Sequence, residues 1–297
     1  KIIETPRDGM QGLDTIIPTR KKIEYINLLL QCGFDTVEVG SFVSPRAIPQ
    51  MADTAEVLEK LDFSKTKSKI AVFNKDELIY NEVITNDFFV EIAINLIEKF
   101  NCKNAIISAV GILNKSEIDQ IKAKIKVIEL NPTTKIPFFN NYATPKTLGV
   151  DRIALVAAAV SKYQNQNVLI IDAGTCITYD FVNSNNEYLG GAISPGLEMR
   201  YKALHQHTSK LPLLSKNEVY KRTGFSTTES IHSGVINGVI CEIEGVITQY
   251  KQDFNDLTVV LTGGDTKFLS KQLKNGIFAN QNFLLQGLNK ILTHNNQ

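Results

Sequence analysis

The chain has 297 residues, of which 43% are hydrophobic and 21% are charged, and its formal net charge is +1. A chain of this length can bury the core of one large or two medium domains. The near-neutral charge gives no electrostatic footprint for nucleic acid or an anionic membrane, so the composition excludes neither enzyme nor binding protein but favours a small-molecule partner.

The apolar segments and the cysteines limit the class of protein further. The longest apolar segments, residues 153–160 and 167–174, are far shorter than the roughly 20 residues that a membrane-spanning helix needs. No basic and then apolar signal segment opens the chain, so we expect a cytoplasmic protein. The cysteines stand far apart without a CxxC pair, which argues against a disulfide scaffold and a thiolate zinc site. They are Cys32, Cys102, Cys176 and Cys241.

The first 68 residues predict an alternation of strands and helices. Apolar residues recur at helical spacing after Thr19, and Gly33 is a helix stop signal. Residues 35–42 (DTVEVGSF) are typical of a buried strand, and residues 52–61 of a second helix. The order strand, helix, strand, helix is that of the beginning of a parallel α/β fold.

A chemical motif, PRDGMQ, occupies residues 6–11. Arg7 and Asp8 at the end of a first strand could polarise a carbonyl group and hold a divalent metal, whereas the alternative is a turn with a surface ion pair. Together with residues 37–58, this segment resembles the N-terminus of hydroxymethylglutaryl-CoA lyase, a metal-dependent TIM-barrel enzyme. The resemblance covers about the first 70 residues and implies that Arg7 polarises the substrate and Asp8 binds the metal.

The rest of the chain does not complete such a lyase site. That family needs a His-x-His pair on a late barrel strand and a cysteine in a Gly-rich loop. Here His205 and His207 lie in a segment with helical flanks, where residues two positions apart point about 200° away from each other. A quarter of a barrel would also leave its strand edges unpaired. We therefore expect a βαβα fragment of TIM-barrel origin rather than a complete lyase.

From Lys69 onward the pattern predicts a second α/β region. Residues 69–84 are typical of a β-hairpin with the polar turn NKDE, and residues 86–100 of an amphipathic helix. A strand, a helix and another strand follow at 104–111, 117–125 and 126–130.

Residues 167–196 carry the first motif with specific chemistry. A buried strand ends in Asp172, turns through Gly174 and Thr175, and returns as the strand CITYDFV. A glycine lets the backbone approach phosphate, a threonine hydroxyl can bind it, and an aspartate can hold a neutralising cation. An ordinary hairpin turn is the alternative. A second strand followed by glycines, at 259–266 with Gly263 and Gly264, favours a nucleotide cleft between two similar halves.

A third motif lies at 140–160, where Asp151 and Arg152 open a long apolar helix. The positive end of the helix dipole would keep Asp151 ionised and able to accept a proton, and Arg152 could bind a substrate carboxylate. An ordinary aspartate at a helix start with a snorkelling arginine is the alternative.

The phrases TLGVDR, DAGTCITYD and GGAISPG occur in one order and spacing, and with them residues 69–297 resemble type III pantothenate kinase. This family belongs to the actin-like/sugar-kinase superfamily, so the resemblance implies an α/β fold with duplicated ribonuclease H-like domains. We expect a lyase-like fragment at 1–68, a first kinase lobe at 69–150 and a second lobe at 151–297. The implied reaction is ATP-dependent phosphorylation of pantothenate to 4′-phosphopantothenate, the first step of coenzyme A biosynthesis, with Mg²⁺ and K⁺ or NH₄⁺.

The resemblance also implies residue roles. Asp151 is the implied general base, Asp172 the ligand of the monovalent cation, and Thr175 an ATP contact. The remaining implied ATP contacts are Gly174, Gly263 and Gly264, and the implied pantothenate contacts are Tyr142, Gly149, Val150, Asp151, Arg152 and Thr227. Because the family's pantothenate pocket lies at a dimer interface, a homodimer is implied.

The stretch from Asp62 to Lys69 is the part that departs from the family. The kinases begin with a strand that ends in Asp-x-Gly-Asn-Thr-x-x-Lys; here Asp62, Thr66 and Lys69 match, but Ser64 and Lys65 replace the Gly and Asn. The residues before it have a helical pattern, so we interpret the stretch as a seam between two sequences and the first kinase strand as absent. Losing one preorganised active-site contact typically costs about 10² to 10³ in rate. We expect weak or absent kinase activity unless residues 35–42 fill the vacant sheet position. The alternatives are a lyase fragment and a non-catalytic regulator that binds pantothenate or nucleotide.

Overall fold

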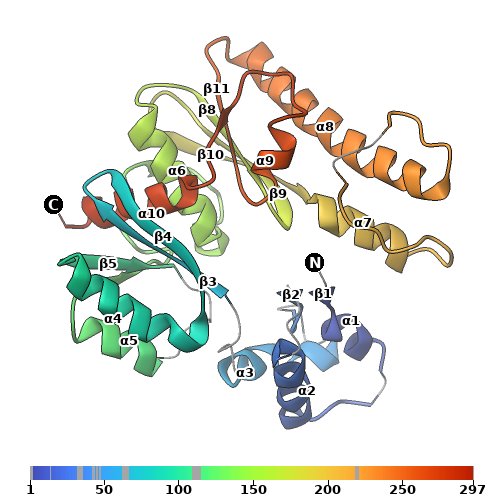
Figure 1. The fold of residues 1–297 in the computed structure, drawn as a ribbon, viewed down its shortest axis with the longest axis horizontal. Coiled ribbons are helices and arrows are strands. Elements are labelled where there is room, and N and C mark those ends of the chain that lie inside the picture. Colours follow the sequence, from blue (N-terminus) through green and yellow to red (C-terminus); the bar gives the residue numbers. More distant parts are fainter. Residues whose placement is uncertain are drawn as a thin grey trace. The chain divides into compact units, whose positions relative to one another are not determined.

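The computed structural model describes residues 3–13, 15–31, 36–41, 44, 46, 48–61, 67–108, 115–217 and 221–296. They form two compact units, Lys1–Glu129 and Leu130–Gln297 (Figure 1). Both units combine strands with helices, so the predicted α/β class is confirmed. The division into a fragment and two lobes stays a prediction. Among the described helices, none has the length and apolar character needed to cross a membrane.

The N-terminal part of the first unit has its own small core. Strand β1 (Ile3–Glu4) pairs in parallel with β2 (Thr36–Val37), so among the described residues of the predicted 35–42 strand two are paired. The helices are α1 (Pro6–Gln11), α2 (Thr19–Gln31), the short η1 (Pro49–Met51) and α3 (Thr54–Glu59). Their buried apolar side chains are Met10, Ile26, Leu30, Met51, Val57 and Leu61. The predicted order of strands and helices is confirmed.

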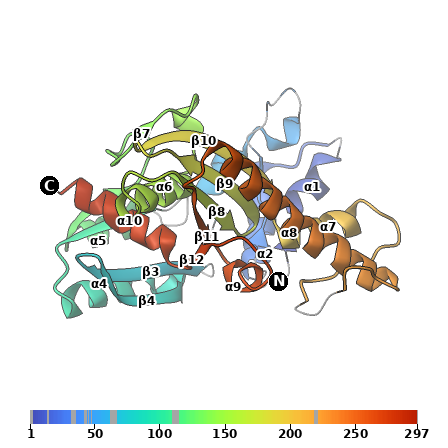
Figure 2. The ribbon, with the colours of Figure 1, turned by 90° about the horizontal axis from the view of Figure 1, so that it is seen from above.

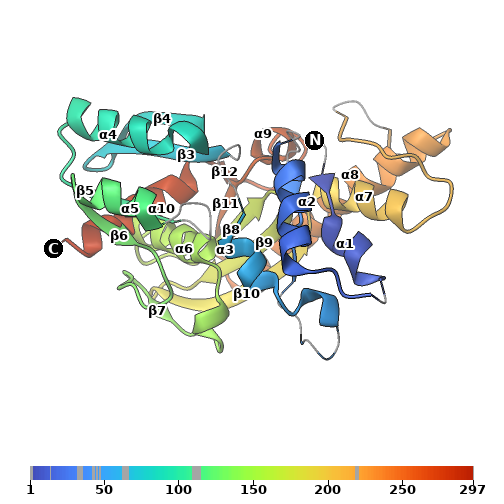
Figure 3. The same cartoon turned by 90° about the horizontal axis from the view of Figure 1, so that it is seen from below.

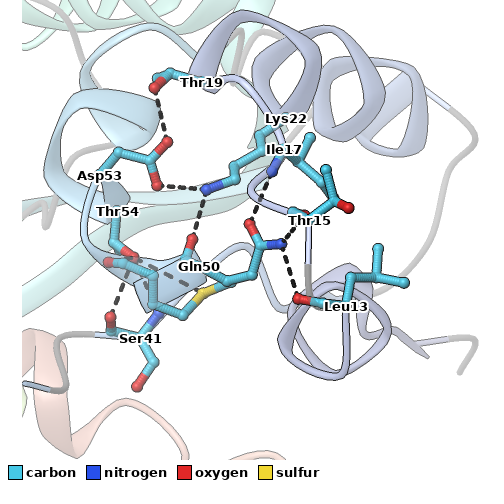
Figure 4. Close-up of polar contacts among 10 residues, drawn as sticks. Leu13, Thr15, Ile17, Thr19, Lys22, Ser41, Gln50, Asp53 and Thr54 are labelled. Carbon is cyan, nitrogen blue, oxygen red and sulfur yellow. Dashed lines mark hydrogen bonds and ion pairs between the residues drawn. The ribbon is translucent and has the colours of Figure 1, made fainter. Parts of the chain in front are cut away.

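The polar contacts of this segment hold α2 against η1 and α3 (Figure 4). The Lys22 side chain is buried, and its Nζ donates to the Gln50 carbonyl at 2.5 Å and to Asp53 Oδ1 at 2.7 Å. Thr19 Oγ1 donates to the other Asp53 oxygen at 2.7 Å. Burial raises the pKa of Asp53, but the hydrogen bonds from Lys22 and Thr19 outweigh it and lower the pKa overall. The cluster is internally paired and serves to join the helices.

The PRDGMQ motif follows the end of β1, as predicted, and forms the short helix α1. Arg7 Nη2 is 3.2 Å from Glu38 Oε2, in a partly exposed ion pair. For Arg7, the structure therefore shows the surface ion pair that the sequence analysis gave as the alternative to a catalytic role. The side chain of Asp8 lies outside the described residues, so its implied role as a metal ligand stays a prediction.

The remainder of the first unit contains two separate two-stranded sheets (Figure 3). Strands β3 (Lys67–Asn74) and β4 (Glu77–Thr85) form the predicted antiparallel hairpin, and β5 (Asn104–Ile107) pairs in parallel with β6 (Lys126–Glu129). The helices between them are η2 (Asn86–Phe88), α4 (Phe89–Lys99) and α5 (Lys115–Lys122). Both sheets contribute to one core with these helices, which includes Ile70, Ala93, Ala105, Ile107, Ile121 and Val127.

The second unit is built on a six-stranded sheet in the order β12-β11-β8-β9-β10-β7. Strands β8 (Val168–Ala173), β9 (Cys176–Val182) and β10 (Glu187–Pro195) form an antiparallel meander. On the other side of β8, β11 (Thr258–Thr262) and β12 (Phe278–Ala279) run parallel to it. The short β7 (Phe139–Asn140) pairs with β10. The order β10-β9-β8-β11-β12, with β9 antiparallel to its neighbours, is that of a ribonuclease H-like sheet.

Helices cover both faces of this sheet (Figure 2). They are η3 (Pro145–Thr147), α6 (Val150–Lys162), α7 (Leu197–Gln206), α8 (Thr227–Asp253), α9 (Thr266–Leu269) and α10 (Phe283–His294). Helix α8 packs on one face, against residues such as Ile171 and Tyr179. Helix α10 crosses α6 so closely that a Cβ on Gly287 would lie 1.7 Å from the Ala154 carbonyl oxygen, so only glycine fits this crossing.

The two units share one order of elements. The first has hairpin β3–β4, helix α4, strand β5, helix α5 and strand β6; the second has hairpin β9–β10, helices α7 and α8, strand β11, helix α9 and strand β12. The second unit also has β8, paired with both β9 and β11. Among the described residues of the first unit, no strand takes the place of β8. The described residues of the segment 35–42 do not fill that place, because Thr36 and Val37 pair with β1.

Candidate functional site

Asp172 lies where the central strand β8 ends, beside the end of β11. Thr262, the last residue of β11, is in register with Asp172. The next residue, Gly263, has φ +94°, and a Cβ there would lie 2.4 Å from Asp172 Oδ1 and from the Ala173 carbonyl oxygen. The Asp265 amide donates to that same carbonyl at 2.9 Å. The two glycine-containing turns are therefore neighbours in the second unit, and the nucleotide cleft between two similar halves stays a prediction.

The turn after β8 is closed by the residue that follows β10. Gly174 N donates to the Cys176 carbonyl at 2.9 Å, and Gly196 N donates to the Thr175 carbonyl at 2.9 Å. A Cβ on Gly196 would lie 2.2 Å from the Gly174 carbonyl oxygen. Thr175 is nevertheless exposed, as is Gly264 of the neighbouring turn. The two turns thus offer backbone and hydroxyl groups to a ligand from a rigid support.

The carboxylate of Asp172, near the end of β8, is affected by two other carboxylates. Burial, followed by the charges of Asp151 and Asp180, raises the pKa of Asp172 to about 6. Asp151 is therefore close enough to interact with Asp172, and it is exposed. A carboxylate with this environment is one that a bound cation would stabilise in its charged form. In the part of the chain that the structure describes, no cluster of three or more His, Cys, Asp or Glu forms a metal site.

Asp151 is positioned by the start of helix α6. Its Oδ1 accepts a hydrogen bond from the Arg152 amide at 2.8 Å. Gly149 is the N-cap residue, and a Cβ there would lie 2.3 Å from the same oxygen. Gly149 is exposed and Val150 is half-buried. Because Gly149 has no side chain, the Asp151 carboxylate can lie against the Gly149 backbone.

Arg152 points into the protein rather than to solvent. Its Nε donates to Asp180 Oδ1 at 2.8 Å, and its Nη2 lies 2.7 Å from the same oxygen but outside hydrogen-bond geometry. Asp180 also accepts from the Tyr188 hydroxyl at 2.7 Å and from Thr178 Oγ1 at 3.1 Å. The Tyr142 ring stacks on Tyr188, with centroids 6.0 Å apart, and lies 5.4 Å from the Arg152 guanidinium carbon.

The sequence analysis did not predict the ion pair between Arg152 and Asp180. Asp180 is fully buried, and burial raises its pKa although Arg152 and Tyr188 act in the opposite direction. The available signal was an aspartate inside the apolar strand CITYDFV, because a buried carboxylate needs a partner. Strand β9 thereby fixes the guanidinium that sequence reasoning assigned to a substrate carboxylate.

The other predicted site residues belong to other elements of the chain. Thr227 is exposed at the start of α8, where Ser226 Oγ accepts from the Glu229 amide at 3.2 Å. Lys69 is exposed on β3 of the first unit. Asp62 and Thr66 are outside the described residues, so the predicted phosphate contact there stays untested.

The predicted helix includes only the first residue of the histidine pair. His205 belongs to α7 and its Nδ1 lies 2.7 Å from the Leu211 carbonyl oxygen, whereas His207 follows the end of that helix.

A family profile and individual relatives identify the same protein family for this chain. The profile of the type III pantothenate kinase family matches residues 60–249. A type III pantothenate kinase of Christiangramia forsetii is 50% identical over 236 residues, which are 79% of this chain and 97% of the relative. The matched region begins two residues before Asp62, so it includes the stretch interpreted as a seam.

Similarity to solved structures is weaker than similarity to the sequence relatives. A glucokinase from an Antarctic psychrotroph is 11% identical, covers 77% of this chain and 96% of its own, and has a TM-score of 0.42. An HMG-CoA lyase from Acinetobacter baumannii is 28% identical and covers 46% of each chain, with a TM-score of 0.20. Neither score supports a conclusion about fold, and the lyase origin of residues 1–68 stays a prediction.

Proposed function

The chain belongs to the type III pantothenate kinase family, and on that premise we propose that it phosphorylates pantothenate with ATP, using the site around Asp151 and Asp172. The single observation that carries the proposal is the exposed Asp151 at the N-terminus of α6, close enough to Asp172 to raise its pKa. A base at a helix start, beside turns that expose glycine and threonine, is the arrangement that phosphoryl transfer to an alcohol requires.

Asp151 is the proposed general base. It lies in the first turn of α6, and its exposure leaves the carboxylate open to a substrate hydroxyl. Its carboxylate is held by the Arg152 amide and accommodated by Gly149. It would accept the proton of the pantothenate alcohol while the γ-phosphoryl group of ATP is transferred in line.

Asp172 is the proposed ligand of a monovalent cation, K⁺ or NH₄⁺. Burial disfavours its charged form, so a cation beside it supplies the missing stabilisation. The chemistry of a single buried carboxylate next to backbone carbonyls fits such an ion. Mg²⁺ would accompany the ATP phosphates, because it commonly keeps several waters and is bound largely through phosphate.

The two turns are the proposed ATP contacts. Exposed Thr175 and Gly264 and the neighbouring Gly174 and Gly263 present groups that a phosphate can approach. The positive φ of Gly263 and its contact with Asp172 tie this surface to the proposed cation ligand. Nucleotide and cation are therefore expected to bind cooperatively.

The proposed pantothenate pocket includes Tyr142, Gly149 and Val150 next to Asp151. Arg152 contributes by orienting Tyr142 and by its pairing with Asp180, rather than as an unpaired cation. We propose, from the family resemblance alone, that Thr227 contacts pantothenate and that the pocket lies at a homodimer interface. We also propose a cytoplasmic location.

A non-catalytic regulator that binds pantothenate or nucleotide is the second candidate. The observation in its favour is the first unit, where no described strand corresponds to β8. The test is ADP release by the full chain with Mg-ATP. Release that requires both pantothenate and K⁺ or NH₄⁺ supports the kinase. Saturable pantothenate binding without ADP release would instead support the regulator.

A further inference from the structure

We propose that Arg200, in the first turn of α7, is a positioning residue that holds the turn Gly174–Thr175 in place for a nucleotide phosphate. The ligand in this inference rests on the proposed function, because that turn is a proposed ATP contact. Arg200 acts through the end of β10 and not by touching the nucleotide. The holding contact can therefore be tested without turnover.

The side chain of Arg200 turns back from α7 to the end of β10. Its Nε donates to the Pro195 carbonyl at 2.9 Å, and its Nη2 donates to Ser194 Oγ at 3.0 Å. The planar guanidinium directs its donors at fixed angles, so it can satisfy both acceptors at once. Because Ser194 and Pro195 are the last two residues of β10, one side chain fixes where this strand ends.

The end of β10 in turn supports the turn Gly174–Thr175. Pro195 is in register with Cys176, and the Gly196 amide donates to the Thr175 carbonyl at 2.9 Å. A Cβ on Gly196 would lie 2.2 Å from the Gly174 carbonyl oxygen and 2.4 Å from the Thr175 carbonyl oxygen. Segments packed this closely cannot move independently, so a shift of Gly196 would displace the turn.

Glu242 holds the guanidinium from the other side. It belongs to α8, which lies beside α7 (Figure 1). Its Oε2 pairs with Arg200 Nη2, and its Oε1 accepts a hydrogen bond from the Tyr179 hydroxyl at 2.8 Å. Burial raises the pKa of Glu242, but the hydrogen bonds from Arg200, Tyr179 and Ser194 outweigh it and lower the pKa overall. The carboxylate therefore stays charged at neutral pH and keeps Arg200 aimed at β10.

The exposure of this ion pair separates a positioning role from a stabilising one. The side chains of Arg200 and Glu242 are 23% and 27% exposed. Ion pairs that water reaches contribute little to global stability. The bonds of Arg200 converge instead on the chain beside Thr175, which is exposed to a ligand. Loss of the guanidinium should therefore be measured at the turn more than in unfolding.

The test compares Arg200→Lys with the natural full chain. Lysine keeps a charge for Glu242, but its single ammonium group cannot reach both acceptors of β10 in the same geometry. The KM for Mg-ATP should rise about tenfold, the size of one lost hydrogen bond to a charged group, while the KM for pantothenate and the urea midpoint change little. The control is Arg20→Lys, whose pair with Glu24 lies in the first unit, and it should change none of these values.

Ser194→Ala tests the route from Arg200 to the turn. It removes one acceptor at the end of β10 and should raise the KM for Mg-ATP about threefold. Added to Arg200→Lys it should have no further effect, because both changes remove the same contact. A further threefold rise in the double variant would overturn the proposed route.

Amide hydrogen exchange gives a readout that does not need nucleotide. The Gly174 and Gly196 amides close the turn, and both should exchange about tenfold faster in Arg200→Lys. Unchanged exchange, or an equal rise in the KM of both substrates, would overturn the proposal. If the natural chain neither bound Mg-ATP nor released ADP, the proposed function would fail, and the exchange rates would still decide whether Arg200 holds the turn.

Discussion

Arg152 and Asp180 form a buried ion pair, with Nε 2.8 Å from Oδ1 and side-chain exposures of 7% and 0%. The pair joins the start of α6, which carries Asp151, to the middle of β9. Tyr188 completes it by donating to the same carboxylate at 2.7 Å. The proposed base is therefore attached to the central sheet through its sequence neighbour.

Replacing Asp180 by Asn should destabilise the second unit strongly. Removing one partner of a buried pair leaves a buried charge uncompensated, which costs about 3 to 5 kcal/mol. Urea unfolding measures the loss. The control is Glu56→Gln, which removes the exposed pair with Lys60 and should change stability by less than about 1 kcal/mol. An Asp180→Asn chain as stable as the control would show that the pair contributes little.

Asp172 should make stability depend on pH and on potassium. Its pKa is raised from 3.8 to about 6, so the folded state holds the proton more tightly than the unfolded state. The free energy of unfolding therefore falls as pH rises from about 4 to above 6, by up to about 3 kcal/mol. Asp172→Asn has no carboxylate to titrate at this position, so its stability should not fall in this way. At pH 8 without potassium it should be more stable than the natural chain.

Potassium should then stabilise the natural chain at pH 8 but leave Asp172→Asn unchanged, as thermal unfolding with KCl against choline chloride would measure. Asp119→Asn, at an exposed position on α5, is the matched control and should respond to potassium like the natural chain. If potassium stabilised Asp172→Asn as much as the natural chain, the assignment of the cation site to Asp172 would be contradicted.

Gly263 and its neighbour Gly264 offer a matched pair of substitutions. Gly263→Ala forces a positive φ on alanine and places Cβ 2.4 Å from Asp172 Oδ1, so it should cost about 2 kcal/mol or more and weaken ATP binding. At Gly264 an added Cβ has nothing within 4 Å, and Gly264→Ala should stay within about 0.5 kcal/mol of the natural chain. Thermal unfolding compares them, and equal effects would contradict the geometry of the two turns.

The double change Ser64→Gly with Lys65→Asn tests the seam. It restores the two family residues that the stretch Asp62–Lys69 lacks. We expect less than about a twofold change in the ADP release rate, because a loop without the strand before it cannot present its amides to phosphate. A rise of tenfold or more, within the range of one preorganised contact, would show that the stretch already works as a phosphate loop.

The local elements could be predicted from the sequence, because hairpin and helix signals lie within a few residues of one another. The helix from Thr19, the hairpin before Thr85 and the turn after Asp172 are examples. Long-range pairing could not be predicted in the same way. The partner of Arg152 lies 28 residues away in sequence. The residues around Thr36 likewise give no sign that Thr36 and Val37 pair with β1.

The site was predicted in part for the same reason. Asp151, Asp172 and Gly263 belong to motifs at the ends of strands or at a helix start, where topology brings side chains together. Arg152 was assigned to substrate because a sequence shows a charge at a helix start but not the carboxylate of another strand that reaches it. Asp180 could be recognised only as a charge that needed a partner.

Turnover by Asp151→Asn is the most direct test of the central claim, measured as pantothenate-dependent ADP release with Mg-ATP and potassium, together with pantothenate binding by calorimetry. The amide cannot accept the proton, so the rate should fall by about 10² or more relative to the natural chain while pantothenate still binds. An Asp151→Asn chain that releases ADP at the natural rate would contradict the account.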